Sequence, residues 1–164
     1  MDKQQLGKLL EDSHREAYLW SRQCCRYDDD LAREILQAVY LKIFEGRARY
    51  NGKSTFRTWL FAVIRYTAID CLKKADLYSD LDEALAVPEE PSPDDDTDYQ
   101  AMLQLLPEQQ AHVLLLAFYH NMTLEAISVV MEIGIGTVRT HYERGKKKLK
   151  ELIEKKQMQD YGGR

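Results

Sequence analysis

Apolar residues recur along this chain at the three- and four-residue spacing of helices that bury one face. In the first half, seven of them form a single stripe: Leu31, Ile35, Leu36, Val39, Tyr40, Ile43 and Phe44. Three aspartates, residues 28–30, stand where acidic side chains favour a helix N-terminus. Gly46 and the segment "NGKS" then interrupt the pattern. We therefore predict a helix that begins at these aspartates and ends before Gly46.

Two more helices are predicted on either side of this one. The segment "STFRTWLFAVIRYTAIDCLKK" predicts a second long helix, with Ser54 or Thr55 as its N-cap and Lys73 and Lys74 at its C-terminal end. A further helix is expected over residues 6–24. The first part of the chain should therefore form a small helical domain.

The C-terminal part predicts three more helices. The first lies in "LLPEQQAHVLLLAFYH", where Pro107 suits the first helical turn and after which Asn121 can end the helix. Thr123 can cap a short helix, the residues "EIG" make a turn, and a longer basic helix is expected over about 135–156. A short helix, a turn containing glycine and a longer helix are the helix-turn-helix arrangement, whose second helix enters the major groove of DNA.

Charge is unevenly distributed, although the 164 residues carry a formal net charge of only −4. Residues 1–74 hold 14 Lys and Arg against 10 Asp and Glu, and residues 108–164 hold 9 against 7. Residues 75–107 hold 10 acids and no base, and include "VPEEPSPDDDTD". Such a segment cannot bury enough apolar surface to offset its ordering entropy, so we expect a flexible linker. The predicted fold is all-α: two small helical domains, at 1–76 and 101–164, joined by an acidic linker at 77–100.

Basic and aromatic residues are interleaved over residues 47–74, which hold seven Lys and Arg and only one acid, Asp70. Aromatic side chains in a basic setting can stack on unpaired bases, because every base has a π-face. The alternative, a place in the apolar core, is expected for most of these aromatics. Tyr50, beside Asn51 and Gly52 in a predicted loop, is the one that we expect to be exposed.

The two blocks together resemble the extracytoplasmic-function (group 4) sigma factors of bacterial RNA polymerase. The segment "DLAREILQAVYLKIFEGRARYNGKSTFRTWLFAVIRYTAIDCLKK" is similar to region 2 of that family, and "LLPEQQAHVLLLAFYHNMTLEAISVVMEIGIGTVRTHYERGKKKLKEL" is similar to region 4. The resemblance extends over about residues 14–152. It implies an alternative sigma factor, not an enzyme, that binds core RNA polymerase and directs promoter-specific initiation of transcription.

The resemblance also implies roles for single residues. Region 2 of the family docks on the clamp helices of the polymerase, which here assigns polymerase binding to Leu31, Glu34, Ile35, Gln37 and Lys42. Region 2 also melts the −10 element and captures an unstacked base, which assigns this contact to Tyr50, Asn51, Lys53, Arg57, Arg65, Tyr66, Lys73 and Lys74. Region 4 packs on the flap and reads the −35 duplex, which assigns that contact to Arg139, Thr140, His141, Glu143, Arg144, Lys147 and Lys148.

Four positions depart from the family's pattern. Ala38 stands where a second acid is common in the clamp-binding helix, Tyr66 where asparagine is usual, and His141 where arginine is common. Glu132 stands at a turn position that is often glycine, which an acid can occupy if its backbone stays outside the left-handed region.

Two alternatives stay open beside a promoter-specificity subunit. A sigma-like decoy that only sequesters an anti-sigma factor would not need DNA-facing arginines such as Arg139 and Arg144. A plain helix-turn-helix regulator would not need the block at 47–74.

Partners and location follow from the same resemblance. It implies promoter DNA, core RNA polymerase and an anti-sigma factor as partners; we expect a cytoplasmic chain without membrane insertion, which the anti-sigma factor could hold at the membrane. No cofactor or metal site is expected, because the four histidines are scattered. The adjacent Cys24 and Cys25 are expected in the core or at its boundary.

Overall fold

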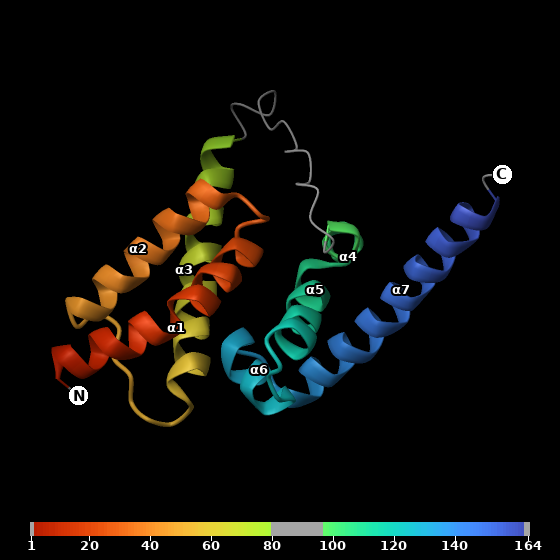
Figure 1. Ribbon diagram of the computed structural model, residues 1–164. Coiled ribbons are helices and arrows are strands. Elements are labelled where there is room, and N and C mark those ends of the chain that lie inside the picture. The colour runs from red at the N-terminus through yellow and green to blue at the C-terminus, as the bar shows by residue number, and fades with distance from the viewer. Residues whose placement is uncertain (1, 80–96, 163–164) are drawn as a thin grey trace. The chain divides into compact units, whose positions relative to one another are not determined.

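The computed structural model describes residues 2–79 and 97–162, and every regular element within these ranges is helical (Figure 1). The chain divides into two compact units. Three helices belong to the first unit: α1 (Lys3–Cys24), α2 (Asp29–Phe44) and α3 (Phe56–Ser79). The second unit holds α4 (Thr97–Gln104), α5 (Glu108–Leu114), the beginning of α6 (Leu124–Met131), and α7 (Ile135–Gly162). The all-α, two-domain prediction is confirmed.

Trp20 anchors the core of the first unit, in which each of the three helices packs on the other two. Its indole is fully buried and lies parallel to the ring of Phe61, with 5.7 Å between ring centroids and 6° between planes. The indole N–H donates to the main-chain carbonyl of Phe61 at 3.0 Å, which satisfies the one polar group that Trp20 brings into the core. This pair therefore fixes α1 against α3.

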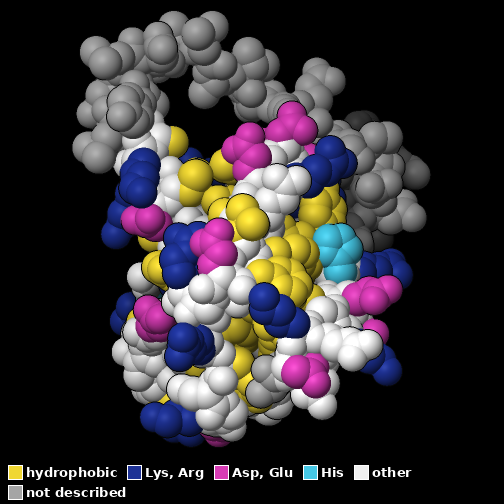
Figure 2. Space-filling view, turned by 90° about the vertical axis from the view of Figure 1, so that its left-hand side faces the viewer, with side chains coloured by type: hydrophobic (Ala, Val, Ile, Leu, Met, Phe, Trp, Pro, Cys, Tyr) yellow, Lys and Arg dark blue, Asp and Glu magenta, His cyan; other side chains and the backbone are white. Residues whose placement is uncertain are grey.

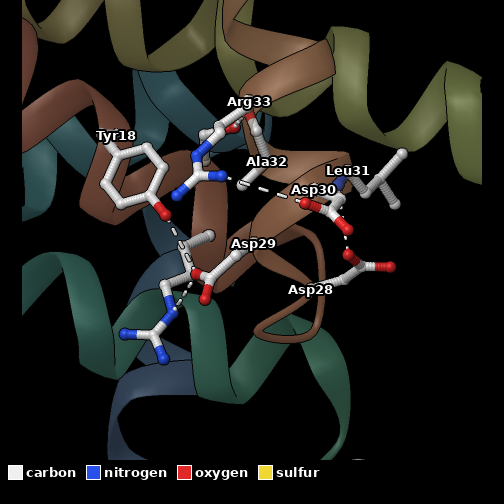
Figure 3. A network of polar contacts seen from close by, with 9 residues as sticks. Tyr18, Asp28, Asp29, Asp30, Leu31, Ala32 and Arg33 are labelled. Carbon is white, nitrogen blue, oxygen red and sulfur yellow. Dashed lines mark hydrogen bonds and ion pairs between the residues drawn. The ribbon is translucent and has the colours of Figure 1, made fainter.

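A polar network at the start of α2 holds this helix to α1 (Figure 3). Asp28 is the N-cap, and its carboxylate accepts from the N–H of Leu31 at 3.1 Å. Asp29 accepts from the Tyr18 hydroxyl at 3.0 Å and pairs with Arg22 Nε at 2.9 Å. The aspartates predicted to favour the helix N-terminus therefore also link two helices.

The second unit is built around the contact between α5 and α7. Leu106, Ala111 and Leu114 are buried there, and partly buried side chains pack against them: Leu103, Tyr142, Leu149 and Leu152. The helix predicted to run toward Asn121 is divided, since α5 passes into a π-helical turn at Leu115–Tyr119. Asn121 then follows with a φ of 54°.

The turn between α6 and α7 corrects one expectation from the sequence. Thr123 caps α6 as predicted, with its Oγ1 accepting from the N–H of Ala126 at 3.1 Å. Glu132, however, has a φ of 55° and so lies in the left-handed region that we expected an acid to avoid. A non-glycine residue in this region costs of the order of 1–2 kcal/mol, which the helices on either side of the turn must offset.

Both ends of the predicted linker at 77–100 are helical. The sequence places the end of the long helix near Lys74, but α3 continues to Ser79, and α4 already begins at Thr97. The segment 80–96 lies outside the described residues. None of the helices in the described ranges has the length and hydropathy needed to cross a membrane.

Gly145 allows the close contact between α5 and α7. An alanine Cβ at this position would lie 3.1 Å from Cδ1 and 3.2 Å from Cγ of Leu114. Leu114 is itself buried, so it has little room to retreat. The larger side chain would therefore push the two helices apart.

We expect Gly145→Ala to destabilise the second unit. Overpacking typically costs about 1–3 kcal/mol, which outweighs the gain of roughly 1 kcal/mol in helix propensity. Gly136→Ala is the matched control, because a Cβ there meets nothing within 4 Å. Urea unfolding, combined with amide hydrogen exchange in α5 and α7, measures both changes. A Gly145→Ala protein as stable as the control would contradict the packing argument.

Candidate functional site

The exposed face of α2 carries a mixed polar and apolar surface. Glu34 and Gln37 are exposed there as predicted, and Leu31 is half-buried. Ile35 is only 3% exposed and belongs to the core, so its predicted contact with a partner is wrong. The helical period turns Ile35 inward beside Leu36 and Val39, which are buried as well.

Two large apolar side chains complete this face: Leu41 was not predicted, and Phe44 was expected in the apolar stripe that faces the core. Leu41 is 57% exposed and Phe44 is 45% exposed. Both follow Glu34 and Gln37 at spacings of three and four residues, so the four side chains share one side of the helix. Leu41 lies outside the apolar stripe, which is a signal that the sequence analysis could have used. Figure 2 views the molecule from the left-hand side of Figure 1, where hydrophobic side chains reach the surface among lysines, arginines and acids.

The loop between α2 and α3 is held closed by an aromatic cluster. The Tyr50 hydroxyl donates to the carbonyl of Ser54, and its ring lies 5.6 Å from that of Phe56 and 5.5 Å from that of Trp59. Thr55 is the residue that caps α3, with its Oγ1 accepting from the N–H of Thr58 at 3.2 Å. Tyr50 is therefore half-buried, and the prediction that it is the exposed aromatic is wrong. The hydroxyl finds a carbonyl inside its own loop, a contact that periodicity does not reveal.

Tyr66 is the aromatic residue of this block that is open to solvent, with 50% of its surface exposed. Its hydroxyl has no hydrogen-bond partner in the part of the chain that the structure describes. Lys42 of α2 lies beside it: the ammonium is 4.8 Å from the centroid of the Tyr66 ring and 3.2 Å from Thr67 Oγ1. Lys42, predicted as a polymerase contact, thus lies against α3 instead of sharing the face of Leu41.

The other residues predicted for −10 DNA lie along α3 and its preceding loop. Asn51 and Lys53 are exposed in the loop, where Asn51 Oδ1 accepts from the N–H of Lys53 at 3.0 Å. Arg57 is half-buried and pairs with Glu16 at 3.4 Å. Arg65 is half-buried, whereas Lys73 and Lys74 are exposed farther along α3. The helical rise puts Lys74 about 25 Å beyond Arg57 along α3, so these residues form a track and not a single pocket.

The residues predicted to read −35 DNA occupy the first half of α7. Six are exposed on this helix: Arg139, Thr140, Glu143, Arg144, Lys147 and Lys148. His141 is half-buried, because it lies toward the side of the helix that carries Val138 and Gly145. Glu143 pairs with Lys146 at 3.4 Å, which leaves the arginines as the exposed charged groups nearest the helix start.

An aromatic stack beside this helix was not predicted. Phe118, 57% exposed, lies over Tyr142 with 5.7 Å between centroids and 23° between planes. Lys146 Nζ lies 4.2 Å from the centroid of Tyr142. The π-helical turn carries Phe118 to this place, and no residue type in the sequence marks such a turn.

The cysteines of α1 and its C-cap belong to the core. Cys24 and Cys25 are each 2% exposed, which confirms the expected place in the core. Burial raises the pKa of the Cys25 thiol to about 11. The thiol is therefore uncharged near neutral pH, and an uncharged thiol is a poor nucleophile and metal ligand.

Two family models match the chain. Sigma-70 region 2 matches residues 9–77, and Sigma-70 region 4 matches residues 97–149. RNA polymerase sigma factor CarQ of Myxococcus xanthus is 30% identical over 132 residues, which cover 75% of this chain and 75% of that protein. The ECF RNA polymerase sigma factor SigX of Bacillus subtilis (strain 168) is 24% identical over 163 residues, with 90% of this chain and 83% of that protein covered.

Two solved structures of similar fold each contain a protein bound to a partner protein. The chain matches the sigma factor RpoE from Bartonella quintana, crystallised with the anti-sigma factor NepR, with a TM-score of 0.79 at 17% identity. That match covers 92% of this chain and 97% of the other. CnrH in complex with the cytosolic domain of CnrY gives a TM-score of 0.68 at 15% identity, covering 93% and 90% of the two chains. At such identities the likeness concerns the fold.

We expect Tyr50→Phe to weaken the first unit by about 1 kcal/mol, because it removes one hydrogen bond inside the loop and leaves the carbonyl of Ser54 without that donor. Tyr66→Phe is the matched control, since its hydroxyl has no such bond, and its unfolding free energy should change by less than about 0.5 kcal/mol. Urea unfolding and hydrogen exchange at residues 50–58 measure both. Equal effects of the two variants would mean that the Tyr50 hydroxyl does not hold the loop.

Proposed function

This chain belongs to the extracytoplasmic-function group of sigma-70 factors, and we propose that it binds core RNA polymerase and directs it to specific promoters. The observation that carries this proposal is that the two matched sigma-factor regions coincide with helices of the two compact units. The region 2 match at 9–77 falls on helices α1 to α3, and the region 4 match at 97–149 falls on α4 to the first half of α7. In each part, an exposed helix face carries side chains that support the proposed role.

In the proposed complex, the exposed face of α2 meets the clamp helices of the polymerase. Glu34 and Gln37 supply hydrogen-bonding groups, and Leu41 and Phe44 supply apolar surface. Large apolar side chains inside a polar border are typical of protein interfaces. The same face is available to an anti-sigma factor, in keeping with the anti-sigma partner of the similar sigma factor RpoE.

In this proposal, the α2–α3 loop and the basic residues along α3 contact the −10 element. Asn51 and Lys53 lie in a loop that the aromatic cluster keeps in shape, and the basic residues of α3 continue from it. Basic side chains along such a path neutralise phosphates without regard to sequence. Tyr50 would support this loop from inside, while Tyr66 is the exposed ring.

The start of α7 enters the major groove of the −35 element. Arg139 and Arg144 reach base edges, because arginine donates two hydrogen bonds to guanine in the geometry that the groove offers. Lys147 and Lys148 lie farther along the helix and contact phosphates. Contacts of the second kind set affinity and orientation, and contacts of the first kind set sequence preference.

Run-off transcription tests the function as a whole. We expect core RNA polymerase with the full chain to transcribe a subset of a random promoter library, while core polymerase alone gives no specific start sites. A decoy that only sequesters an anti-sigma factor would bind core or partner without producing such transcripts. Unchanged transcription on adding the chain would therefore reject the proposal.

Single substitutions in α7 test the assignment of its residues. Arg139→Ala or Arg144→Ala should cost about 1–3 kcal/mol of binding to the −35 duplex and relax the preference at one base pair. Lys147→Ala should weaken all sequences alike and lower the salt slope by about one. Lys155→Ala, which changes an exposed lysine two turns farther along the helix, is the control and should change neither. Fluorescence anisotropy at several salt concentrations measures the affinities, and equal, sequence-independent losses at all three sites would remove base reading from α7.

A further inference from the structure

Lys146 joins an exposed acid to the aromatic stack beside α7. Its Nζ lies 4.2 Å from the centroid of the Tyr142 ring and 3.4 Å from Oε1 of Glu143. Lys146 follows Tyr142 and Glu143 by four and three residues, so the three side chains are neighbours on the surface of the helix. One ammonium therefore bridges a ring and a carboxylate.

The aromatic stack gives this bridge a fixed support. Tyr142 is half-buried and packs against the apolar cluster between α5 and α7, and Phe118 lies over its ring. A ring held by the core and by a second ring has few orientations, so the ammonium above it is restrained as well. The side chain of Lys146 is accordingly only 40% exposed, whereas that of Glu143 is 70% exposed. The lysine is packed, and the acid that it holds is open to solvent.

We propose that Lys146, Tyr142 and Phe118 are positioning residues for Glu143, which they hold as an acceptor for one cytosine of the −35 element. The inference rests on the proposed function, because Glu143 meets base edges only if α7 enters the major groove. The family resemblance assigns Glu143 to the −35 contact, but it assigns no role to the other three. Glu143 lies one turn beyond Arg139, so it shares the side of the helix that is proposed to meet the bases.

A carboxylate selects cytosine because it accepts hydrogen bonds and donates none. In the major groove, cytosine offers the donor group N4, whereas guanine offers only acceptors and thymine offers an acceptor and a methyl group. Adenine offers a donor with an acceptor beside it, so one of its two groups repels a carboxylate. Cytosine is therefore the base that best satisfies Glu143.

The restraint on Glu143 affects discrimination as well as affinity. Fixing a long side chain during binding costs conformational entropy, and a side chain fixed beforehand avoids part of that cost. A restrained carboxylate also cannot turn away from an acceptor on the wrong base, so the wrong base is penalised more strongly. If Lys146 only neutralised repulsion between the acid and the DNA phosphates, it would instead raise the affinity for all sequences alike.

The test uses holoenzyme made from core RNA polymerase and the full chain, on a promoter recovered by the run-off selection. Each −35 base pair is changed to the other three in turn, and competition binding measures the affinity for every version. We expect one position at which the wild type prefers cytosine by about 5- to 150-fold, the range of one good contact to a base edge. Glu143→Gln should shift this preference to adenine, because an amide matches the donor and acceptor of adenine.

Substitutions behind Glu143 should act at the same base pair. Lys146→Met should reduce the preference for cytosine about 2- to 10-fold, since it removes an ion pair and a cation–π contact that are each weak. Lys146→Arg can make both contacts and should restore the preference. Tyr142→Leu and Phe118→Leu should reduce it, and Tyr142→Phe should keep it. In a Glu143→Ala background, Lys146→Met should leave the remaining preference unchanged, because no acid is left to hold.

Lys148→Met is the matched control, because Lys148 is exposed and pairs with no acid in the described part of the chain. It should weaken binding to all versions of the promoter alike. Thermal unfolding of each variant and its affinity for core polymerase are measured alongside.

Three results would overturn the proposal. The first is a loss in Lys146→Met that is equal for all four bases, since Lys146 would then act only on phosphates. The second is an unchanged set of preferences in Glu143→Gln. The third is a Phe118→Leu protein that loses affinity for core polymerase while its base preference persists, which would make the stack a partner surface. A wild type without base preference at any −35 position would instead reject the proposed function.

Discussion

The first unit depends on one buried contact, the indole of Trp20 against the ring and carbonyl of Phe61. It joins a helix from the beginning of the unit to the middle of its longest helix, and α2 packs on both. Because the apolar interior is closed in this way, Leu41, Phe44 and Tyr66 are not needed for the core. Large side chains that the core does not use, and that the protein nonetheless exposes, are candidates for contact with partners.

Some basic residues make ion pairs that link helices, and others are exposed without such a pair. Arg22 links α1 to α2 through Asp29, and Arg57 pairs with Glu16. Surface pairs of this kind contribute at most about 1 kcal/mol each, so their effect is chiefly to orient the side chains. Arg139, Arg144, Lys147 and Lys148 make no ion pair within the described part of α7, whereas Lys146 pairs with Glu143 and lies over Tyr142. A net charge of −4 for the chain is therefore compatible with DNA binding, since the free cations are concentrated on a few helix faces.

The sequence predicted the features that depend on the helical period and on interactions between residues close together in the chain. Six of the helices, the caps at Asp28 and Thr123, and the helix-turn-helix order all follow from such signals. Features that depend on contacts between distant residues did not follow: Ile35 was assigned to a surface although it is buried, and Tyr50 was expected to be exposed. The position of Lys42 against α3 did not follow either, because its hydrogen-bond partner Thr67 is 25 residues away in sequence. The acidic composition predicts a linker over 77–100, but it did not predict the helical turns at each end of that range.

The connections between helices show how the angles of the elements are set. Four non-glycine residues have positive φ, and each lies in a connection: Arg26, Tyr27, Asn121 and Glu132. Glycine at such a place would remove strain but would also give the unfolded chain more freedom, so the two effects on stability oppose each other. The α2–α3 loop uses glycine instead, at Gly46 and Gly52, and relies on the Tyr50 cluster for its shape. In the helix-turn-helix, Glu132 lies in the turn that precedes α7, so its positive φ is part of the path by which the chain enters α7. A side chain restricts the conformation of this turn more than glycine would, and this favours a fixed start of α7. The base reading proposed for Arg139 and Arg144 depends on such a fixed start, because bidentate hydrogen bonds to a base pair need a defined geometry.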